Sequence, residues 1–181
     1  MPFIETHFPG LLIFEPRIFG DDRGYFFESF NQKIFEEKGI NTNFVQDNQA
    51  RSGYGVLRGL HYQSGEFAQA KLVRVLEGMV LDVVVDLRPD SPTYGQHYSI
   101  ELSAENKRQL YVPRGFAHGY VVLSETAEFF YKCDNFYNKE SEGGLIYNDP
   151  SLAIDWKIEQ DKALLSDKDT QLPTFGNHRP I

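Results

Sequence analysis

The stretch GVLRGLHYQ, residues 55–63, carries a single histidine, His61, in a strand-like segment that contains glycines. Residues two apart on a strand point to the same face, so His61 and Gln63 share one side of the predicted strand. A histidine placed in this way could supply half of a metal site. It could equally act as a base, because the unperturbed pKa of histidine lies near neutral pH.

Alternation of residue type with a period of two surrounds this stretch and indicates β-strands. The clearest alternation places Leu81, Val83, Val85 and Leu87 on one face and Asp82, Val84 and Asp86 on the other. Similar runs, broken by Gly, Pro, Asn, Asp or Ser, cover residues 25–30, 71–78, 97–103, 108–115, 118–124, 127–137 and 143–149. Many short strands at this spacing predict an all-β protein, an antiparallel sandwich or jelly roll.

Helix signals are few and short. Residues 31–40 combine Asn31 as a helix N-cap with Gly39 as a stop, and residues 159–165 predict a second short helix. No internal repeat, low-complexity tract or linker interrupts the chain. We therefore predict a single domain over residues 1–181, with a few short helices at its periphery.

Charge and composition limit the classes of function. The 181 residues carry a formal net charge of -8, which argues against non-specific binding of nucleic acid, because that binding requires Lys and Arg to neutralise phosphates. Cys133 is the single cysteine, so no intramolecular disulfide can form, and this fits a reducing compartment. The sequence has no basic, apolar leader and no apolar run of the roughly 20 residues that a membrane helix needs. We expect a cytoplasmic protein without a membrane partner.

Two short motifs extend the interpretation of His61. Gly55 is followed six residues later by His61, and Pro113, Gly115 and His118 have the spacing P-x-G-x-x-H. These motifs resemble those of the cupin superfamily, in which the first motif normally carries a second histidine two residues after the first. The resemblance covers roughly the central half of the chain and implies a jelly roll.

The second metal-binding histidine of the first motif is absent. Gln63 stands in its place, and a neutral amide has weak affinity for transition metals. Metal binding is therefore the minority interpretation, and a general base is the alternative. A third possibility is a hydrogen-bonded core histidine. The polar side chains of Arg58, Gln63 and Lys71 near His61 favour a ligand-binding site, because burying such groups is costly unless they find partners.

Longer blocks narrow the resemblance to one family. They cover residues 19–31, 44–63, 68–88, 91–96, 102–137, 141–150 and 165–169. In this order they strongly resemble the dTDP-4-dehydrorhamnose 3,5-epimerase family, a metal-free family of cupins. The resemblance implies an isomerase that converts dTDP-4-dehydro-6-deoxy-glucose into dTDP-4-dehydro-L-rhamnose, in the biosynthesis of dTDP-L-rhamnose. It implies neither a metal nor a redox cofactor.

The resemblance also implies roles for four residues. His61 matches the base of the family, and Asp169 in LSDKD matches the carboxylate that pairs with it. Tyr131 matches the acid that returns a proton from the opposite face. Lys71 matches the residue beside the carbonyl oxygen, where a fixed cation favours the enolate.

Further positions match substrate contacts of the family. These are Arg23, Glu28, Gln46, Asp47, Asn48, Arg58, Lys71, His118, Glu142 and Lys168. Phe19, Phe26 and Tyr137 are candidates for stacking on the thymine base. Asp82 and His118 form a second candidate polar pair. The resemblance implies a homodimer with exchanged N-terminal strands, so that some contacts come from the second subunit.

Three alternatives to the double epimerase remain open from the sequence. A relative with the same base and acid could invert carbon 3 or carbon 5 alone. A metal-dependent cupin, such as a dioxygenase or an isomerase, would need further strong ligands. A sugar-nucleotide binding module without catalysis is the third, because a fold alone does not establish an activity.

Overall fold

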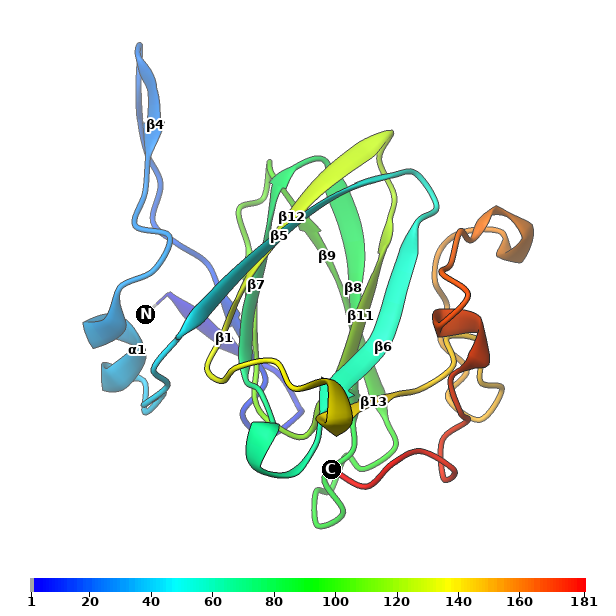
Figure 1. Cartoon of the computed structure of the whole chain (residues 1–181). Helices are drawn as coiled ribbons and strands as arrows, with labels where there is room; N and C mark the ends of the chain where they lie inside the picture. Colours follow the sequence, from blue (N-terminus) through cyan, green and yellow to red (C-terminus); the bar gives the residue numbers. More distant parts are fainter. Residues whose placement is uncertain (1) are drawn as a thin grey trace.

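Two antiparallel sheets face each other and enclose the central core (Figure 1). The structure, a computed structural model, describes residues 2–181. In spatial order, the six-stranded sheet contains β1 (Phe3–Glu5), β2 (Leu12–Phe14), β10 (Gln109–Val112), β7 (Lys71–Glu77), β12 (Thr126–Cys133) and β5 (Gln46–Gly53). The five-stranded sheet contains β13 (Glu142–Gly144), β6 (Leu57–Gln63), β11 (Phe116–Val122), β8 (Met79–Asp86) and β9 (His97–Ser103). The predicted jelly roll is confirmed.

The remaining elements are short and lie outside the two sheets. They are the hairpin strands β3 (Phe19–Asp21) and β4 (Gly24–Phe26), the helix α1 (Gln32–Glu37), and the 3₁₀ helices η1 (Gly65–Phe67), η2 (Lys139–Ser141), η3 (Gln160–Lys162) and η4 (Asp169–Gln171). Asn31 caps α1 as predicted, because its side chain accepts a hydrogen bond from the backbone N–H of Lys33. Among residues 2–181, no helix is long and apolar enough to cross a membrane.

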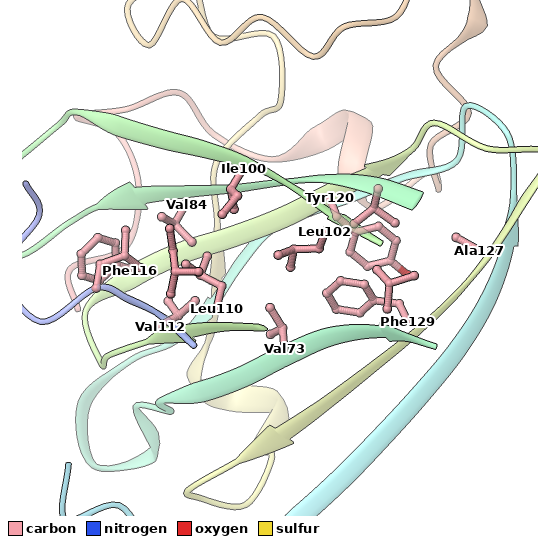
Figure 2. Packing of buried hydrophobic residues seen from close by; sticks show 14 of the residues in the cluster. Val73, Val84, Ile100, Leu102, Leu110, Val112, Phe116, Tyr120, Ala127 and Phe129 are labelled. Atoms are coloured by element: carbon pink, nitrogen blue, oxygen red, sulfur yellow. The ribbon is translucent and has the colours of Figure 1, made fainter. Parts of the chain in front are cut away.

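The core between the sheets follows the predicted alternation. Val84 from β8, Val73 from β7 and Phe129 from β12 pack together with side chains of neighbouring strands (Figure 2). The opposite face of β8 carries Leu81 and Val83, which pack against the C-terminal part of the chain in a second cluster. Strand β8 is thus covered on both faces, which explains its nearly continuous apolar sequence.

A β-bulge in β6 places two polar side chains on the same face. On β11, His118 lies opposite His61 and Tyr120 lies opposite Arg58, with a shift of register between the two pairs. On a regular strand, Arg58 and His61 would point to opposite faces, because they are three residues apart. Gly59 permits the bulge: its φ is +124°, and a Cβ there would lie 2.6 Å from the Cα of Gly119.

Two predicted elements are shorter than expected. The predicted helix at 159–165 is only the three-residue η3, because Leu164 instead bonds to the backbone of Gly55 and Leu57 beside β6. The predicted strand at 25–30 is reduced to β4. Strands β3 and β4 pair only with each other and form a hairpin that projects from the body of the molecule (Figure 1).

Candidate active site

A cavity of about 550 Å³ opens between the two sheets. Its volume lies within the range of small-molecule sites, roughly 300–1,000 Å³. The residues that line it come from both sheets and from positions 164–169, which lead into η4. Among the residues singled out from the sequence, the lining includes Arg58, His61, Lys71, His118, Tyr131, Lys168 and Asp169. The fold therefore brings together residues that lie more than one hundred positions apart.

His61 and Asp169 form a close pair on one wall of this cavity. Nε2 of His61 lies 2.5 Å from Oδ1 of Asp169. The His61 side chain is 38% exposed, whereas the Asp169 side chain is only 5% exposed. A carboxylate can only accept a hydrogen bond, so Nε2 carries the proton and Nδ1 is left for a ligand. The buried partner therefore orients the more accessible imidazole.

The protein environment keeps Asp169 ionised. Burial raises the pKa of Asp169, but the hydrogen bond and charge of His61 and the hydrogen bonds from Ser166 and Gly59 lower it, and the net pKa lies below its usual range. The backbone N–H of Asp169 also donates to Oγ of Ser166, at 3.2 Å. Asp169 is thus an anion whose position is fixed on several sides.

Stability at acidic pH tests this pair. A depressed folded-state pKa stabilises the fold above the unfolded value of about 3.9, and the contribution is lost as the pH falls through the lower folded value. We therefore expect Asp169→Asn to have a lower Tm than the wild type at pH 7, and the difference to narrow below about pH 4. Melting curves across this range are the measurement. Asp161→Asn, at an exposed position in η3, serves as the control. A difference in Tm that stayed constant with pH would contradict the assignment.

Lys71 and Tyr131 come from the opposite sheet. Tyr131 lies two residues before Cys133 on β12, and Cys133 pairs with Lys71 on β7, so all three side chains share one face. Nζ of Lys71 lies 5.8 Å from the centre of the Tyr131 ring. Burial, followed by nearby Cys133 and Tyr120, raises the pKa of Tyr131 to about 12 despite the opposing effect of Arg58. The phenol therefore keeps its proton at neutral pH.

Lys71 has an unusual environment for a lysine. Burial lowers its pKa, whereas electrostatic interactions with Cys133 and Asp82 raise it, and the net pKa lies below the usual range. A cation in such a setting is poorly hydrated, so an anionic or strongly polarised oxygen would be a favourable partner.

A second cavity of about 370 Å³ adjoins the first and shares His61, Lys71 and Tyr131 with it. Gln46 and Asn48 on β5 line this second cavity. Tyr137, in the loop after β12, also lines it. The amide side chains can donate and accept hydrogen bonds, and Tyr137 is an exposed aromatic ring. The two cavities therefore meet at the three residues that they share, and Arg58, Lys168 and Asp169 line only the first.

Two further polar groups are held within the first cavity. Nη2 of Arg58 donates to Oγ of Ser52 at 3.1 Å, and Nε2 of His118 lies 2.9 Å from Oδ2 of the fully buried Asp82. The predicted polar pair of Asp82 and His118 therefore exists. At the rim, Nζ of Lys168 donates to Oε2 of Glu142 at 2.6 Å.

Besides Glu142, which contacts Lys168 but lines neither cavity, three predicted contact residues lie outside the cavities of their own chain. Asp47 points to the opposite face of β5 and pairs with Lys132, with Nζ and Oδ1 2.9 Å apart. Arg23 lies at the exposed turn of the β3–β4 hairpin and pairs with Asp21. Glu28 follows the hairpin and accepts a hydrogen bond from Asn31. Within a single chain, these residues cannot join the others in the site.

The sequence interpretation missed Tyr120, Ser52 and Ser166. Tyr120 and Ser166 line the first cavity, and Ser52 holds Arg58. Strand alternation could have identified Tyr120, because it is two residues from His118 on β11. No sequence signal distinguishes Ser52 or Ser166 from an ordinary surface serine.

The amide that replaces the second cupin histidine is bonded to the protein. Oε1 of Gln63 accepts a hydrogen bond from the backbone N–H of Asn138 at 2.9 Å. Within residues 2–181, no three or more His, Cys, Asp or Glu side chains gather in an arrangement that could hold a metal ion. The metal-dependent alternative therefore has no candidate ligand set in the described part of the chain.

The jelly roll and the polar cavity between its sheets define a cupin-type protein. A family model described as dTDP-4-dehydrorhamnose 3,5-epimerase matches residues 5–177. The chain therefore belongs to the dTDP-4-dehydrorhamnose 3,5-epimerase family of enzymes.

Individual relatives cover nearly the whole chain. The dTDP-4-dehydrorhamnose 3,5-epimerase of Pseudomonas aeruginosa is 58% identical over 170 residues, which are 93% of each chain. The crystal structure of the corresponding enzyme from Elizabethkingia anophelis has a TM-score of 0.94 and 60% identity, and the match covers 97% of this chain and 96% of that one. A Legionella pneumophila 3,5-epimerase, solved in complex with dTDP-4-keto-L-rhamnose, has a TM-score of 0.92 and 52% identity, and the match covers 97% and 93% of the two chains.

Proposed function

We propose that this protein epimerises carbons 3 and 5 of dTDP-4-dehydro-6-deoxy-glucose to give dTDP-4-dehydro-L-rhamnose. One observation carries the proposal: His61, paired with Asp169, lines the cavity from the five-stranded sheet, and Tyr131 lines it from the six-stranded sheet. Inversion of a carbon requires a base on one face and an acid on the other. Membership of the family and the bound sugar nucleotide in the Legionella relative support the choice of substrate.

The first step removes a proton next to the ketone. The carbonyl at carbon 4 acidifies the hydrogens on carbons 3 and 5, and His61 takes one of them as a general base. The C–H electron pair moves into the ring, and the charge collects on the oxygen of carbon 4 as an enolate. Asp169 stabilises the imidazolium that forms, and the ammonium of Lys71 stabilises the enolate oxygen.

The second step returns a proton to the opposite face. Tyr131 retains its phenol proton at neutral pH and donates it to the same carbon, after which the enolate returns to the ketone. Solvent then takes the proton from His61 and restores that of Tyr131. The same sequence at the second carbon gives the doubly inverted product, and no electron leaves or enters the sugar.

The charged groups of the site suit a nucleotide diphosphate. Arg58 and Lys168 line the first cavity and offer positive charge to the phosphates, although the protein as a whole is acidic. Gln46, Asn48 and Tyr137 in the second cavity can bond to and stack on thymine. We assign the sugar to the first cavity and the base to the second.

Identification of the product tests the proposal. Purified protein is incubated with dTDP-4-dehydro-6-deoxy-glucose, and proton NMR of the sugar reports the configuration at each carbon. Inversion at both carbons supports the proposal. Inversion at one carbon only would assign the narrower reaction of a single-site epimerase. Tight binding without turnover would indicate a binding module.

We also propose a homodimer in which the β3–β4 hairpin reaches the site of the partner. The hairpin exposes Phe19 (50%) and Phe26 (65%), an unusual amount of apolar surface for a projecting element. It also carries Arg23, which lies outside the cavity of its own chain. A second subunit would cover the aromatic rings and receive the arginine.

Mixing of two inactive variants tests the exchange. We expect Arg23→Ala and His61→Ala each to be impaired as pure proteins. After unfolding and refolding together, one site of each mixed dimer would receive a normal hairpin and a normal base, so about a quarter of all sites would recover. Refolding of each variant alone is the control. Absence of recovery in a sample shown to contain mixed dimers would contradict the exchange.

We propose that the protein is located in the cytoplasm. Cys133 is a buried free thiol, and free thiols persist in reducing compartments.

A further inference from the structure

Asp82 is a buried carboxylate that its surroundings satisfy only in part. It lies in the middle of β8 and is fully buried. Oδ2 lies 2.9 Å from Nε2 of His118, but Oδ1 has no hydrogen-bond partner within residues 2–181. A buried polar oxygen without a donor is costly, so its retention calls for an explanation other than stability.

A second carboxylate on the same strand provides the contrast. Asp86 is also fully buried, yet its oxygens accept hydrogen bonds from Arg88, Ser91 and Thr93. Its pKa lies below its usual range, because these hydrogen bonds outweigh the effect of burial. Asp86, whose hydrogen bonds hold the loop after β8, is therefore supplied with donors for both of its oxygens. Asp82 differs because it lies beside the active site.

Two groups of the cavity depend on Asp82. Since a carboxylate only accepts, Nε2 of His118 must carry a proton, and Nδ1, which has no protein partner among the described residues, is left for the ligand. Lys71 is the second group: burial lowers the pKa of its ammonium, and Cys133 and then Asp82 act in the opposite direction. Tyr120, directly opposite Asp82 on β11, completes this wall of the cavity.

We propose that Asp82 is a positioning residue: it fixes the tautomer and orientation of His118 towards the sugar and holds a counter-charge near the Lys71 ammonium. The inference rests on the proposed epimerase function. It assigns His118 as an acceptor for a sugar hydroxyl group while the ring is neutral. The unpartnered Oδ1 is then a cost in stability that is retained for activity.

The matched variants Asp82→Asn and Asp86→Asn test this role. An asparagine at 82 has the shape of aspartate but neither its charge nor its strict role as acceptor. We expect the kcat of Asp82→Asn to fall by about 10–10²-fold, a typical effect of losing a group that orients an active-site side chain. The affinity for dTDP and the Tm should stay close to those of the wild type. Asp86→Asn should lower Tm and leave kcat per folded site unchanged.

The pH profile gives a readout that a structural role would not move. Charged or titratable groups near Lys71 include Cys133 and Tyr131 on β12, Asp82 on β8, His61 and Arg58 on β6, and His118 and Tyr120 on β11. Loss of the Asp82 charge should shift the alkaline limb of kcat/KM to lower pH. The Asp86→Asn profile should coincide with that of the wild type.

NMR of ¹⁵N-labelled histidine tests the inference without turnover. His118 should carry its proton on Nε2 in the wild type and lose that preference in Asp82→Asn. A wild-type Nδ1–H tautomer would overturn the inference, as would an Asp82→Asn enzyme with wild-type kcat and pH profile, or one whose loss of kcat merely followed a loss of folded protein. If wild-type protein failed to invert either carbon while His118 kept the expected tautomer, the proposed function would fail and the pairing would stand.

Discussion

Replacement of His61 by alanine is expected to lower kcat by about 10³-fold, because general-base catalysis contributes roughly 10²–10⁴-fold in enzymes. The imidazole of His61 faces the cavity and is oriented by the buried carboxylate of Asp169. His118 has a similar carboxylate partner, but its side chain is only 7% exposed, against 38% for His61. Asp169 cannot take over the role, since its pKa lies below the usual range and its side chain is buried. Steady-state turnover and exchange of sugar hydrogens with deuterated water are the two measurements.

Binding and folding must be measured in the same variant. The affinity for dTDP should stay within a few-fold of the wild type, because the nucleotide contacts are assigned to other side chains. His97→Ala on β9, outside both cavities, is the matched histidine control and should retain full activity. His61→Asn keeps a donor for the buried Asp169 and separates loss of the base from loss of stability. Turnover of His61→Ala within tenfold of the wild type would remove His61 as the base.

Replacement of Tyr131 by phenylalanine is expected to separate proton removal from inversion. The phenol is the proposed acid, and its pKa of about 12 keeps the proton available. Without it, His61 still removes the proton and returns it to the same face, so hydrogen exchange persists while formation of inverted product falls by about 10²-fold. NMR of the sugar in deuterated water reports both quantities in one sample.

The control for this variant is Tyr54→Phe, an exposed tyrosine in the turn after β5 that lines neither cavity. It should exchange and invert like the wild type. Two results would contradict the role of Tyr131. One is undiminished inversion in Tyr131→Phe. The other is an equal loss of exchange and inversion, which would place Tyr131 in proton removal instead.

The sheet architecture could be predicted from the sequence because strand alternation depends on neighbouring residues only. The two faces that residues 81–87 predict are both buried in the structure, one against the opposite sheet and one against the C-terminal segment. The prediction of a helix over residues 159–165 was wrong in length, because a contact distant in sequence decides the structure there. Its last residues pair with the backbone beside β6, a long-range contact that no local pattern encodes.

The site was predictable only with the help of the family resemblance. His61 and Asp169 are 108 positions apart, and nothing local in LSDKD distinguishes Asp169 from a solvated loop acid. The sequence also contained no sign of the bulge at Gly59, which places Arg58 and His61 on the same face of β6. The absence of a hydrogen-bond donor for Oδ1 of Asp82 among residues 2–181 depends on the three-dimensional structure, so the residue type alone cannot reveal it.

The most direct test of the central claim is deuterium exchange during turnover. The protein, treated with chelator, is incubated with dTDP-4-dehydro-6-deoxy-glucose in deuterated water, and the sugar is analysed by NMR. We expect deuterium at both carbon 3 and carbon 5, with exchange lost in His61→Ala. If neither carbon 3 nor carbon 5 acquired deuterium, in protein shown to be folded and dimeric, the result would contradict proton abstraction next to the ketone as the activity of this site.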